Sequence, residues 1–375
     1  MGKRILVTST DLMMIQFLVP HVRYLSENGF DVEVACSDVG GRMDEVRTAL
    51  DGAAKAIHTV RLHRSPAAAE NLKGYGDMKR VIASGNYDII WANEPVMGVV
   101  TRLAARKARK KGTRVVYMAH GFHFFKGAPK KNWLVCPIEL LMSRFCDTLV
   151  TINWEDYRWA KQWLKTPKIE HIDGIGVDFT ARACAVPRDA KRKELGVHGD
   201  DILVLSVGEL QQRKNHEVII RAIALLNNPH IKYFICGRGE LLDYLTKLAN
   251  SLQLQNQVFF LGYRKDIPEI MNASDIYAHP SRREGLGLAS LEAMASGLPL
   301  VTSNVQGIPD YVENGITGFM CAPMDIPQYA KHLDILISDP ELRSKIGQTN
   351  LQRVKKYAVS QIQPAIAAIM NPTTA

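Results

Sequence analysis

The sequence predicts an α/β protein built from two doubly wound parallel sheets that follow one another along the chain. Short apolar runs alternate with segments of helical period, first up to about residue 164 and again from residue 202. A polar stretch that ends at Asp201 separates the two sets, and we expect it to connect two domains. The length of 375 residues suits two domains, each large enough for its own core.

The elements of the first domain come in a regular order. Apolar runs predict strands at 5–8, 32–36, 88–91, 115–118 and 148–152, and helical periods predict helices at 16–28 and 154–164. A basic helix lies between the strands at 88–91 and 115–118. Continuous apolar runs are typical of parallel strands that are buried on both faces.

The second domain repeats the same rhythm. The predicted strands are 202–207, 232–236, 257–261, 275–279 and 299–302, with helices between them. We therefore expect an N-terminal domain at 1–185 and a C-terminal domain at 186–356.

Composition narrows the class of protein. Hydrophobic residues make up 46% and charged residues 23%, which is ordinary for a soluble globular protein. The six cysteines stand singly, which argues against a disulfide framework or a cysteine metal site and fits a reducing compartment. The start of the chain is charged too early for a signal peptide, and no apolar run approaches the ~20 residues of a membrane-spanning helix. We expect a cytoplasmic protein.

The net charge of +9 is uneven along the chain. Residues 1–180 hold 26 lysines and arginines against 19 acidic residues, and seven basic residues crowd between Arg102 and Arg114. This basic stretch is either a solvated helix face or a surface that attracts anionic lipid head groups. Nucleic acid ranks last as a partner, because the stretch has neither an aromatic platform nor a recognisable reading motif.

A second stretch of the first domain mixes aromatic and basic residues. It contains Phe122, Phe124, Phe125 and Trp133 together with Lys126, Lys130 and Lys131. Aromatic rings prefer the membrane–water boundary and lysines prefer anionic head groups, so the stretch fits an interfacial loop. The alternative is that the aromatic rings pack into the core while the lysines are solvated. The sequence leaves both interpretations open.

Two glutamates eight positions apart form the most specific pattern of the chain. Glu284 stands just before a Gly-Leu-Gly turn, and Glu292 follows inside a helix that we expect to begin near Leu288. A helix N-terminus presents unpaired N–H groups and a partial positive charge, which favour a phosphate. Carboxylates beside a phosphate site suggest a ligand with anionic oxygens and neutral hydroxyl groups, and a nucleotide sugar has both.

A second loop adds the cations that such a ligand needs. The strand at 202–207 ends at Gly208, and Arg213 and Lys214 follow in the loop before the next helix. Ligands bind at the carboxyl ends of strands in this kind of sheet. The planar fork of an arginine and the point charge of a lysine suit a diphosphate. A solvated charge pair is the alternative for Arg213 and Lys214, and the two glutamates downstream make it the weaker one.

These pieces together resemble the retaining glycosyltransferases of family 4, also called group 1. The matching segments are 208–216, 278–299 and 307–319, and Glu284 with Glu292 matches the family's E-x7-E pair. The resemblance implies the GT-B fold, in which two Rossmann-like domains face a central cleft. It also implies that the last helix, from about Tyr357, crosses back to the first domain.

The resemblance also implies how a donor would bind and react. Arg213 and Lys214 would neutralise the diphosphate of a UDP-sugar, Glu284 would bind the sugar and support the oxocarbenium-like centre, and Glu292 would bind the ribose. The residues expected at the donor are Gly208, Arg213, Lys214, Arg264, Gly285, Leu286, Gly287, Leu288 and Glu292. No Asp-x-Asp motif is present, so we expect no metal and no other cofactor.

The first domain would hold the acceptor. His120 follows a predicted strand and matches the family's pocket histidine, whereas His123 is the weaker candidate. Many members carry a Gly-Gly pair after the first strand, but this chain has Ser9, Thr10 and Asp11, which would line the cleft instead. In this departure the chain resembles the subgroup that acts in capsule and exopolysaccharide assembly.

The subgroup implies a lipid-linked (polyprenyl diphosphate) or saccharide acceptor, and an enzyme that works at the inner face of the membrane. The main alternative is a non-catalytic partner that kept the fold and lost the chemistry. The charged residues of the motif are all present, which argues against such a scaffold. A nucleotide-sugar epimerase of the same fold lacks this spacing, and a phosphorylase would need a pyridoxal lysine for which no motif is seen.

Overall fold

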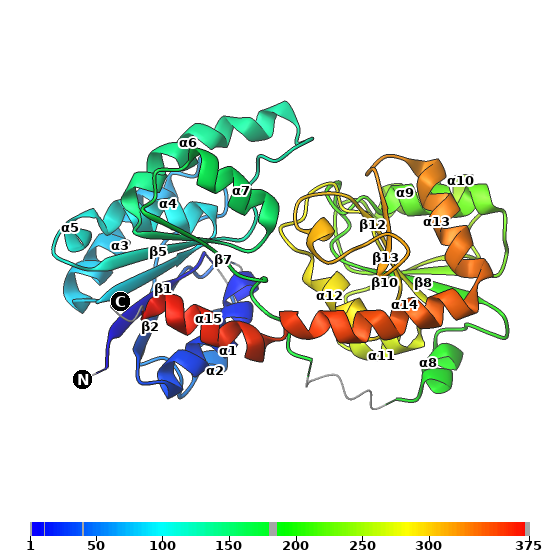
Figure 1. Cartoon of the computed structure of the whole chain (residues 1–375), viewed down its shortest axis with the longest axis horizontal. Helices are drawn as coiled ribbons and strands as arrows, with labels where there is room; N and C mark the ends of the chain where they lie inside the picture. The colour runs from blue at the N-terminus through cyan, green and yellow to red at the C-terminus, as the bar shows by residue number, and fades with distance from the viewer. Residues whose placement is uncertain (1, 11, 40, 180–185, 372–375) are drawn as a thin grey trace. The chain divides into compact units, whose positions relative to one another are not determined.

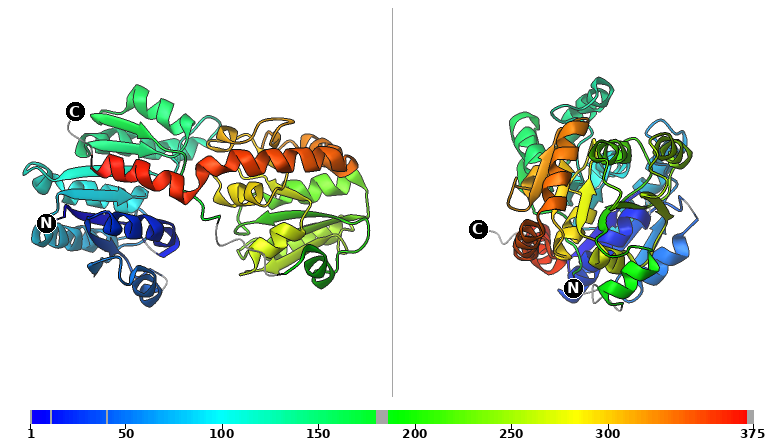
Figure 2. Two further views of the ribbon diagram at one scale, coloured as in Figure 1. Left: turned by 60° about the horizontal axis from the view of Figure 1, so that its bottom comes forward. Right: turned by 90° about the vertical axis from the view of Figure 1, so that its right-hand side faces the viewer.

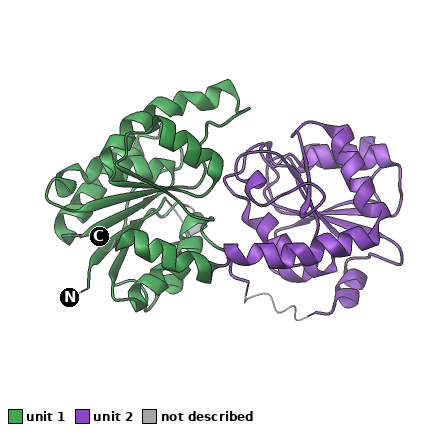
Figure 3. Ribbon diagram, in the orientation of Figure 1, with its two compact units in different colours: residues 1–176, 359–375 green, residues 177–358 purple. Residues whose placement is uncertain are grey.

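The computed structural model describes residues 2–10, 12–39, 41–179 and 186–371. The chain forms two compact units, which Figure 3 shows in separate colours. Unit 1 contains Met1–Gly176 and Val359–Ala375, and unit 2 contains Val177–Ala358. The domain boundaries expected from the sequence were 185/186 and 356/357.

Unit 1 is built on a seven-stranded parallel sheet with the strand order β3-β2-β1-β4-β5-β6-β7. Its strands are β1 Arg4–Thr8, β2 Asp31–Cys36, β3 Ala56–Thr59, β4 Ile89–Asn93, β5 Arg114–Ala119, β6 Thr148–Thr151 and β7 Lys168–His171. The five predicted strands are confirmed. The sequence pattern missed β3 and β7, which are short, lie at the sheet edges and keep part of their side chains in contact with solvent.

Helices cover both faces of this sheet. They are α1 Leu12–Glu27, α2 Met43–Leu50, α3 Glu70–Gly85, α4 Pro95–Ala104, α5 Arg106–Arg109, η1 Lys130–Val135, α6 Cys136–Met142, η2 Ser143–Phe145, α7 Trp154–Trp163 and α15 Val359–Met370. Helix α1 packs against α2 and α15, while α3 and α6 pack against α4 on the other face (Figure 1). The sequence predicts two domains, each with a doubly wound parallel sheet of this type, and the fold class is confirmed.

Helix α15 joins the C-terminal end of the chain to unit 1. It packs along α1, and Gln363 Nε2 donates to the Pro20 carbonyl at 2.9 Å. The Arg114 guanidinium, at the start of β5, donates to the Ile369 carbonyl. The expected return of the last helix to the first domain is confirmed, and two further views of it are given in Figure 2.

Unit 2 has a six-stranded parallel sheet with the order β10-β9-β8-β11-β12-β13. Its strands are β8 Ile202–Val207, β9 Ile231–Cys236, β10 Val258–Gly262, β11 Ile276–His279, β12 Leu300–Ser303 and β13 Gly318–Cys321. Its helices are α8 Arg188–Glu194, α9 His216–Leu226, α10 Leu242–Ser251, α11 Ile267–Ala273, α12 Leu288–Ala295, η4 Ile308–Asp310, α13 Ile326–Ser338, α14 Pro340–Arg353 and η5 Val354–Tyr357. Helix α12 begins at Leu288, as the sequence predicts.

The polar stretch that ends at Asp201 is more than a connection. It contains α8, which packs against α11 of unit 2. Arg188 and Arg192 of this stretch both form ion pairs with Asp275, at 2.5 and 3.0 Å. Helix α8 thus belongs to unit 2, as the expected boundary at 186 has it, but the sequence did not predict the helix, because ion pairs rather than an apolar stripe attach it. Residues 180–185 lie outside the described part of the chain.

Both sheets reverse their strand order once. The reversal lies between β1 and β4 in unit 1 and between β8 and β11 in unit 2. The loops at the carboxyl ends of two such strands leave in opposite directions and open a crevice, which is where ligands of this architecture bind. In the described part of the chain, no helix is long and apolar enough to cross a membrane.

The aromatic and basic stretches of unit 1 separate into two parts each. Phe122, Phe124 and Phe125 are buried, so the core interpretation is confirmed for these three rings, whereas Trp133 is exposed. In the basic stretch, Arg102 is buried and pairs with Glu139. The solvated part of that stretch consists of the exposed side chains Arg106, Lys107, Lys110 and Lys111.

Candidate active site

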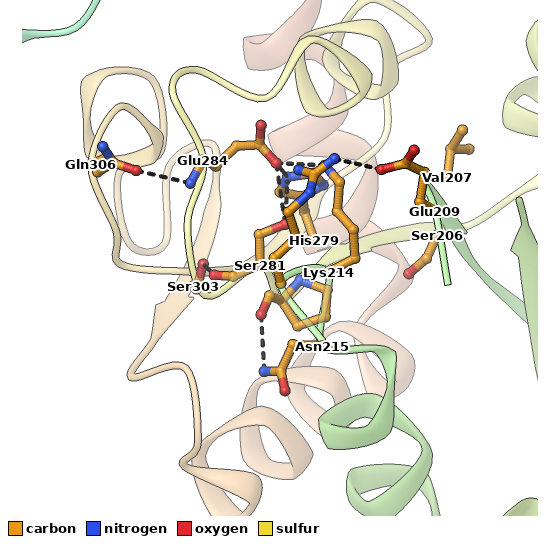
Figure 4. A network of polar contacts seen from close by, with 12 residues as sticks. Ser206, Val207, Glu209, Lys214, Asn215, His279, Ser281, Glu284, Ser303 and Gln306 are labelled. Atoms are coloured by element: carbon orange, nitrogen blue, oxygen red, sulfur yellow. Dashed lines mark hydrogen bonds and ion pairs between the residues drawn. The ribbon is translucent and has the colours of Figure 1, made fainter. Parts of the chain in front are cut away.

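The loops that follow β8 and β11 meet at the strand reversal of unit 2. Lys214, in the loop after β8, places its Nζ 2.6 Å from Oε2 of Glu284, in the loop after β11 (Figure 4). The two side chains are 13% and 14% exposed, so the ion pair is largely shielded from solvent. The sequence motifs thus join at one point although 70 residues separate them.

The Glu284 carboxylate has three donors around one oxygen. Besides Lys214, His279 Nε2 lies 3.1 Å and Ser281 Oγ 3.2 Å from Oε2. Burial would raise the pKa of this carboxyl, but the charge of Lys214 and the hydrogen bond from His279 hold the pKa well below its ordinary value. Glu284 is therefore an anion at neutral pH, and a base is the chemical role that its low pKa suits least.

His279 ends β11 beneath this carboxylate. Burial and the charge of Lys214 lower the pKa of His279, against the hydrogen bond to Glu284. The ring is therefore neutral at neutral pH, and because a carboxylate can only accept, Nε2 carries the proton. His279 thus fixes the position of Glu284 without adding a charge to the site.

The backbone around Glu284 is also fixed. Its N–H donates to the side-chain oxygen of Gln306 at 3.1 Å (Figure 4). Gly287 forms the N-cap of α12 with φ +89°, and a Cβ there would lie 2.9 Å from the Tyr311 hydroxyl and 3.3 Å from His279 Nε2. Only glycine fits both this backbone conformation and this space.

Helix α12 begins at this point with glycine in place of a capping side chain. The first turn of the helix carries the positive end of the helix dipole, and in this turn the Ser290 N–H donates to the Gly287 carbonyl at 2.9 Å. Gly285, Leu286 and Gly287 form the turn that leads into the helix, and the helix begins at Leu288. Leu286 is buried. Glu284 precedes this positive end by four residues. The positive end favours an anionic ligand beside Lys214.

Asn215 holds three loops together behind Lys214. Its Nδ2 donates to the carbonyl of Pro280 at 3.0 Å, in the loop after β11, and to that of Pro323 at 2.7 Å, in the loop after β13. Its Oδ1 accepts from Arg282 Nε at 2.9 Å. Asn215 has a left-handed backbone (φ 59°, ψ 33°), which asparagine tolerates better than most residues.

The other expected donor residues lie at different places in unit 2. Gly208 lies beneath the Lys214 side chain, since a Cβ there would be 3.3 Å from Lys214 Cδ and Cε. Arg213, from the same loop, pairs with Glu209 at 2.7 Å and stays 36% exposed. The loop is tied to the β11 loop because the Arg282 N–H donates to the Arg213 carbonyl at 2.7 Å.

Glu292 and Arg264 are more distant members of the expected set. Glu292 lies half-buried on α12, and burial together with its charge raises the pKa of the buried Tyr277 hydroxyl. Arg264 forms ion pairs with Asp266 at 2.5 Å and with Glu194 of α8 at 3.2 Å. Arg264 therefore helps to attach α8 to the rest of unit 2.

The strand reversal of unit 1 carries a second polar cluster. Ser9 Oγ and the Thr10 N–H, after β1, donate to Oε2 of Glu94, after β4, at 2.7 and 2.6 Å. Glu94 has φ 62° and ψ 162°, a backbone region that belongs almost entirely to glycine and costs about 1–3 kcal/mol for other residues. Such strain persists where the surroundings hold a residue in place, and functional sites are where it gathers. Asp11 lies outside the described residues.

His120 lies next to this cluster. Its Nε2 lies 2.9 Å from Asn93 Oδ1, and Asn93 Nδ2 donates to the Thr8 carbonyl at 3.2 Å. Because the amide nitrogen of Asn93 faces a carbonyl, Oδ1 is the acceptor and His120 Nε2 carries the proton. Burial and the charge of His21 lower the pKa of His120 to about 4, so the ring is neutral and Nδ1 is its acceptor.

Several residues of these clusters were not proposed as site residues from the sequence, among them His279, Gln306 and Glu94. Their positions depend on which strands are neighbours, and a single sequence does not show this. His279 ends a predicted strand and Glu94 follows one, so the rule that ligands bind at strand ends was the available signal. In the described residues, no group of three or more His, Cys, Asp or Glu side chains is arranged to hold a metal ion.

Comparison with protein families agrees with the geometry of both units. Residues 187–353 match the family described as "Glycosyl transferases group 1", and residues 5–153 match "Glycosyl transferase 4-like". EpsD of Bacillus subtilis, named as a glycosyltransferase, is 34% identical over 99% of this chain and 97% of its own length.

Other relatives and solved structures extend this comparison. The UDP-Gal:alpha-D-GlcNAc-diphosphoundecaprenol alpha-1,3-galactosyltransferase of Escherichia coli is 29% identical over 85% of this chain and 83% of its own. The crystal structure of HepE of Anabaena with UDP and glucose superimposes with a TM-score of 0.82 at 22% identity, over 99% of this chain and 100% of that one. The chain therefore belongs to the group 1 glycosyltransferases, and it is a glycosyltransferase of glycan biosynthesis with the GT-B fold.

Proposed function

We propose that the enzyme transfers a hexose or N-acetylhexosamine from a UDP-sugar to a lipid-linked or saccharide acceptor, with retention of the anomeric configuration and without a metal ion. The contact between Lys214 and Glu284 at the start of α12 carries this proposal. It joins a cation for the diphosphate and an anion for the sugar at one point, beside a helix N-terminus that favours phosphate.

The chemistry follows from the charges of this site. As the bond between sugar and phosphate breaks, negative charge grows on the leaving diphosphate, and Lys214, Arg213 and the amides at the start of α12 stabilise it. Positive charge grows on the sugar, and the Glu284 anion stabilises it. These fixed cations do the work that a metal ion does in other transferases, so magnesium is not required.

Retention fits the absence of a suitable base among the described donor-site residues. Glu284 has too low a pKa to remove a proton from a hydroxyl group, and His279 uses its Nε2 proton to hold Glu284. The leaving phosphate itself would take the acceptor proton on the same face of the sugar. Solved relatives supply the choice of nucleotide, since HepE is described with UDP and with UDP-glucose.

The acceptor would bind at the strand reversal of unit 1. Glu94, Ser9 and Thr10 form a polar cluster there, with the neutral His120 and its free acceptor Nδ1 beside it. The partly buried Glu94 carboxylate is an acceptor of the kind to which sugar hydroxyl groups donate, and its strained backbone marks a position that the surroundings hold in place. We therefore add Glu94 to the residues that bind the acceptor.

A lipid-linked acceptor is the version that the relatives favour. The Escherichia coli relative acts on a sugar attached to diphosphoundecaprenol, as its name states. An acceptor of that kind lies in a membrane, so the enzyme would work at the membrane surface on the cytoplasmic side. Capsule and exopolysaccharide assembly are the processes that use such acceptors.

A donor screen tests the proposal. Purified protein receives UDP-, GDP- and ADP-sugars with EDTA present, and release of the nucleoside diphosphate is followed with and without polyprenyl diphosphate sugars. We expect release from one UDP-sugar, lost in Glu284→Gln and Lys214→Met. Activity that appears only after addition of magnesium or manganese would contradict metal independence. No release with any donor, and no binding of UDP by calorimetry, would contradict the donor site and favour a non-catalytic partner.

A further inference from the structure

The segment formed by η1 and α6 is apolar on the side that faces solvent. Trp133 is 42% exposed, Leu134 77%, Ile138 45% and Leu141 52%. We call these four side chains the α6 surface. Single exposed apolar side chains are common, but a set on one short segment marks a contact surface. Positions 134, 138 and 141 have the spacing that aligns side chains along one face of a helix.

The one acidic residue of this segment points the opposite way. Glu139 is 7% exposed, and its carboxylate accepts hydrogen bonds of 3.1 Å from Nη1 and Nη2 of Arg102. The Arg102 guanidinium, itself buried, lies 3.8 Å from the centre of the Tyr117 ring. A helix on the surface of a soluble protein normally turns its charges outward and its leucines inward. Here the buried ion pair reverses that order.

The surroundings of the α6 surface are positively charged. Between residues 126 and 146 the chain has four basic residues, all exposed, and Glu139 as its only acidic residue. The basic residues are Lys126, Lys130, Lys131 and Arg144. Because Glu139 is paired inside unit 1, the segment presents leucine, isoleucine and tryptophan side chains together with exposed cations.

This surface is supported from below. The Trp133 ring lies 5.7 Å from that of Phe124, and Phe124 stacks on Phe122 at 5.0 Å, both inside the core of unit 1. Helix α6 also packs against α4 (Figure 1). The apolar side chains are therefore held outward by a packed base, and their exposure does not depend on a loose loop.

We propose that the α6 surface binds an anionic lipid bilayer, with the four apolar side chains entering the head-group region and the surrounding lysines and arginine contacting lipid phosphates. Aromatic and aliphatic side chains beside basic residues are the composition that an anionic bilayer attracts. A second copy of the chain is disfavoured, because a twofold contact would bring the same cations face to face. Nucleic acid would leave the leucines in water.

The proposal rests on the proposed function only for its purpose, which is to bring unit 1 to an acceptor carried by lipid. The experiment therefore uses neither donor nor acceptor. The full chain is mixed with vesicles of phosphatidylcholine alone or of phosphatidylcholine and phosphatidylglycerol in equal parts, and the fraction that floats with vesicles is measured. UDP binding by calorimetry, measured in parallel, reports on the donor site and on folding.

The variant Leu134→Glu with Ile138→Glu tests the surface directly. Both side chains are exposed, so folding should persist, and the matched control Leu72→Glu with Leu225→Glu changes exposed leucines of α3 and α9. A second pair compares Lys130→Glu with Lys131→Glu against Lys110→Glu with Lys111→Glu in the other basic stretch. We expect wild type and both controls to float with anionic vesicles only, and both α6-surface variants to float at least about tenfold less.

Three results would overturn the inference. If wild type does not float with anionic vesicles, the protein has no surface that binds this lipid. Equal flotation of wild type and the Leu134 and Ile138 variant, with loss in the Lys110 and Lys111 variant, assigns lipid binding to the other basic stretch. A dimer in solution that the Leu134 and Ile138 substitutions dissociate makes a second copy the occupant. If wild type floats with anionic vesicles but does not bind UDP, the proposed function is contradicted and this inference stands.

Discussion

Lys214 and Glu284 form a shielded ion pair with 2.6 Å between Nζ and Oε2, at the strand reversal of unit 2. The two charges that a nucleotide-sugar transferase needs for opposite ends of its donor thus contact each other. A diphosphate that approaches Lys214 competes with Glu284 for the same ammonium group, and a sugar that approaches Glu284 competes with Lys214. Substitutions on either side should therefore separate binding from catalysis.

Glu284→Gln should stop transfer and spare binding of the nucleotide. The amide keeps the shape of the side chain but cannot support positive charge on the sugar, so we expect kcat to fall by about 10²–10³. UDP should bind at least as tightly as before, because Lys214 no longer shares its charge with a carboxylate. Transfer rates and calorimetry measure the two effects. Glu313→Gln, in an exposed ion pair with Arg353, is the control, and wild-type rates in Glu284→Gln would remove Glu284 from the mechanism.

Lys214→Met should weaken UDP binding and also change the protonation of Glu284. Burial is the largest single influence on the Glu284 carboxyl and raises its pKa, so the loss of the opposing ammonium charge should let the pKa rise. We expect a UDP affinity about 10–100-fold lower and an acid limb of the pH–rate profile that moves to higher pH. Lys247→Met, at an exposed position of α10, serves as the control. An unchanged acid limb would mean that Lys214 does not set the charge of Glu284.

Asn215→Ala should loosen the three loops that this side chain connects. The variant loses three hydrogen bonds and places alanine in a left-handed conformation, so we expect unit 2 to lose about 2–4 kcal/mol of unfolding free energy. Asn227→Ala separates the two causes, because Asn227 is also left-handed but exposed, and only ~1 kcal/mol is expected there. Denaturant unfolding measures both, and equal losses would deny Asn215 its connecting role.

Three histidines with lowered pKa should make the protein sensitive to mild acid. Burial lowers the pKa of His21 to about 4, that of His120 to about 4 and that of His216 to about 3. The unfolded chain therefore binds more protons than the folded chain below about pH 6.5, and stability falls as the pH drops through this range.

The window between about pH 6.5 and 4.5 separates histidines with lowered pKa, His279 included, from carboxyl groups with lowered pKa, which act only below it. Each such histidine should contribute up to ~1.4 kcal/mol per pH unit to the slope of unfolding free energy. His21→Gln should reduce that slope for unit 1, and His198→Gln, at an exposed position, should not. A flat stability profile in this window would show that the histidines protonate freely in the folded protein.

Glu94→Gln should affect the acceptor alone. Glutamine can place its amide oxygen where Oε2 of Glu94 lies and accept from both Ser9 Oγ and the Thr10 N–H, so the cluster keeps its geometry while its charge is lost. We expect the KM for the acceptor to rise about tenfold, as for loss of one charged hydrogen bond, with unchanged UDP affinity. Acceptor titrations at saturating donor measure this, and an unchanged KM would leave Glu94 with a purely structural role.

The central strands of both sheets could be predicted because they are buried on both faces and appear as continuous apolar runs. The edge strands β3 and β7 could not, since Ala56–Thr59 and Lys168–His171 are half-exposed and have no such run. Helix α8 was missed for a related reason: its attachment depends on Lys191 and on the neighbouring Arg188 and Arg192, and polar contacts leave no periodic pattern.

The fold class, the start of α12 at Leu288 and the grouping of Arg213 and Lys214 with Glu284 as one motif could be predicted from the chain alone. Strand hydrophobicity, glycine turns and charge spacing are local properties. The tertiary structure decided which cation contacts Glu284. Lys214 reaches the carboxylate, while its neighbour Arg213 turns to Glu209. It also placed Glu139 of α6 inside unit 1 and Leu141 of α6 at the surface, because Glu139 pairs with the buried Arg102. Such choices depend on the order of strands and on contacts between residues far apart in the chain, which no local pattern contains.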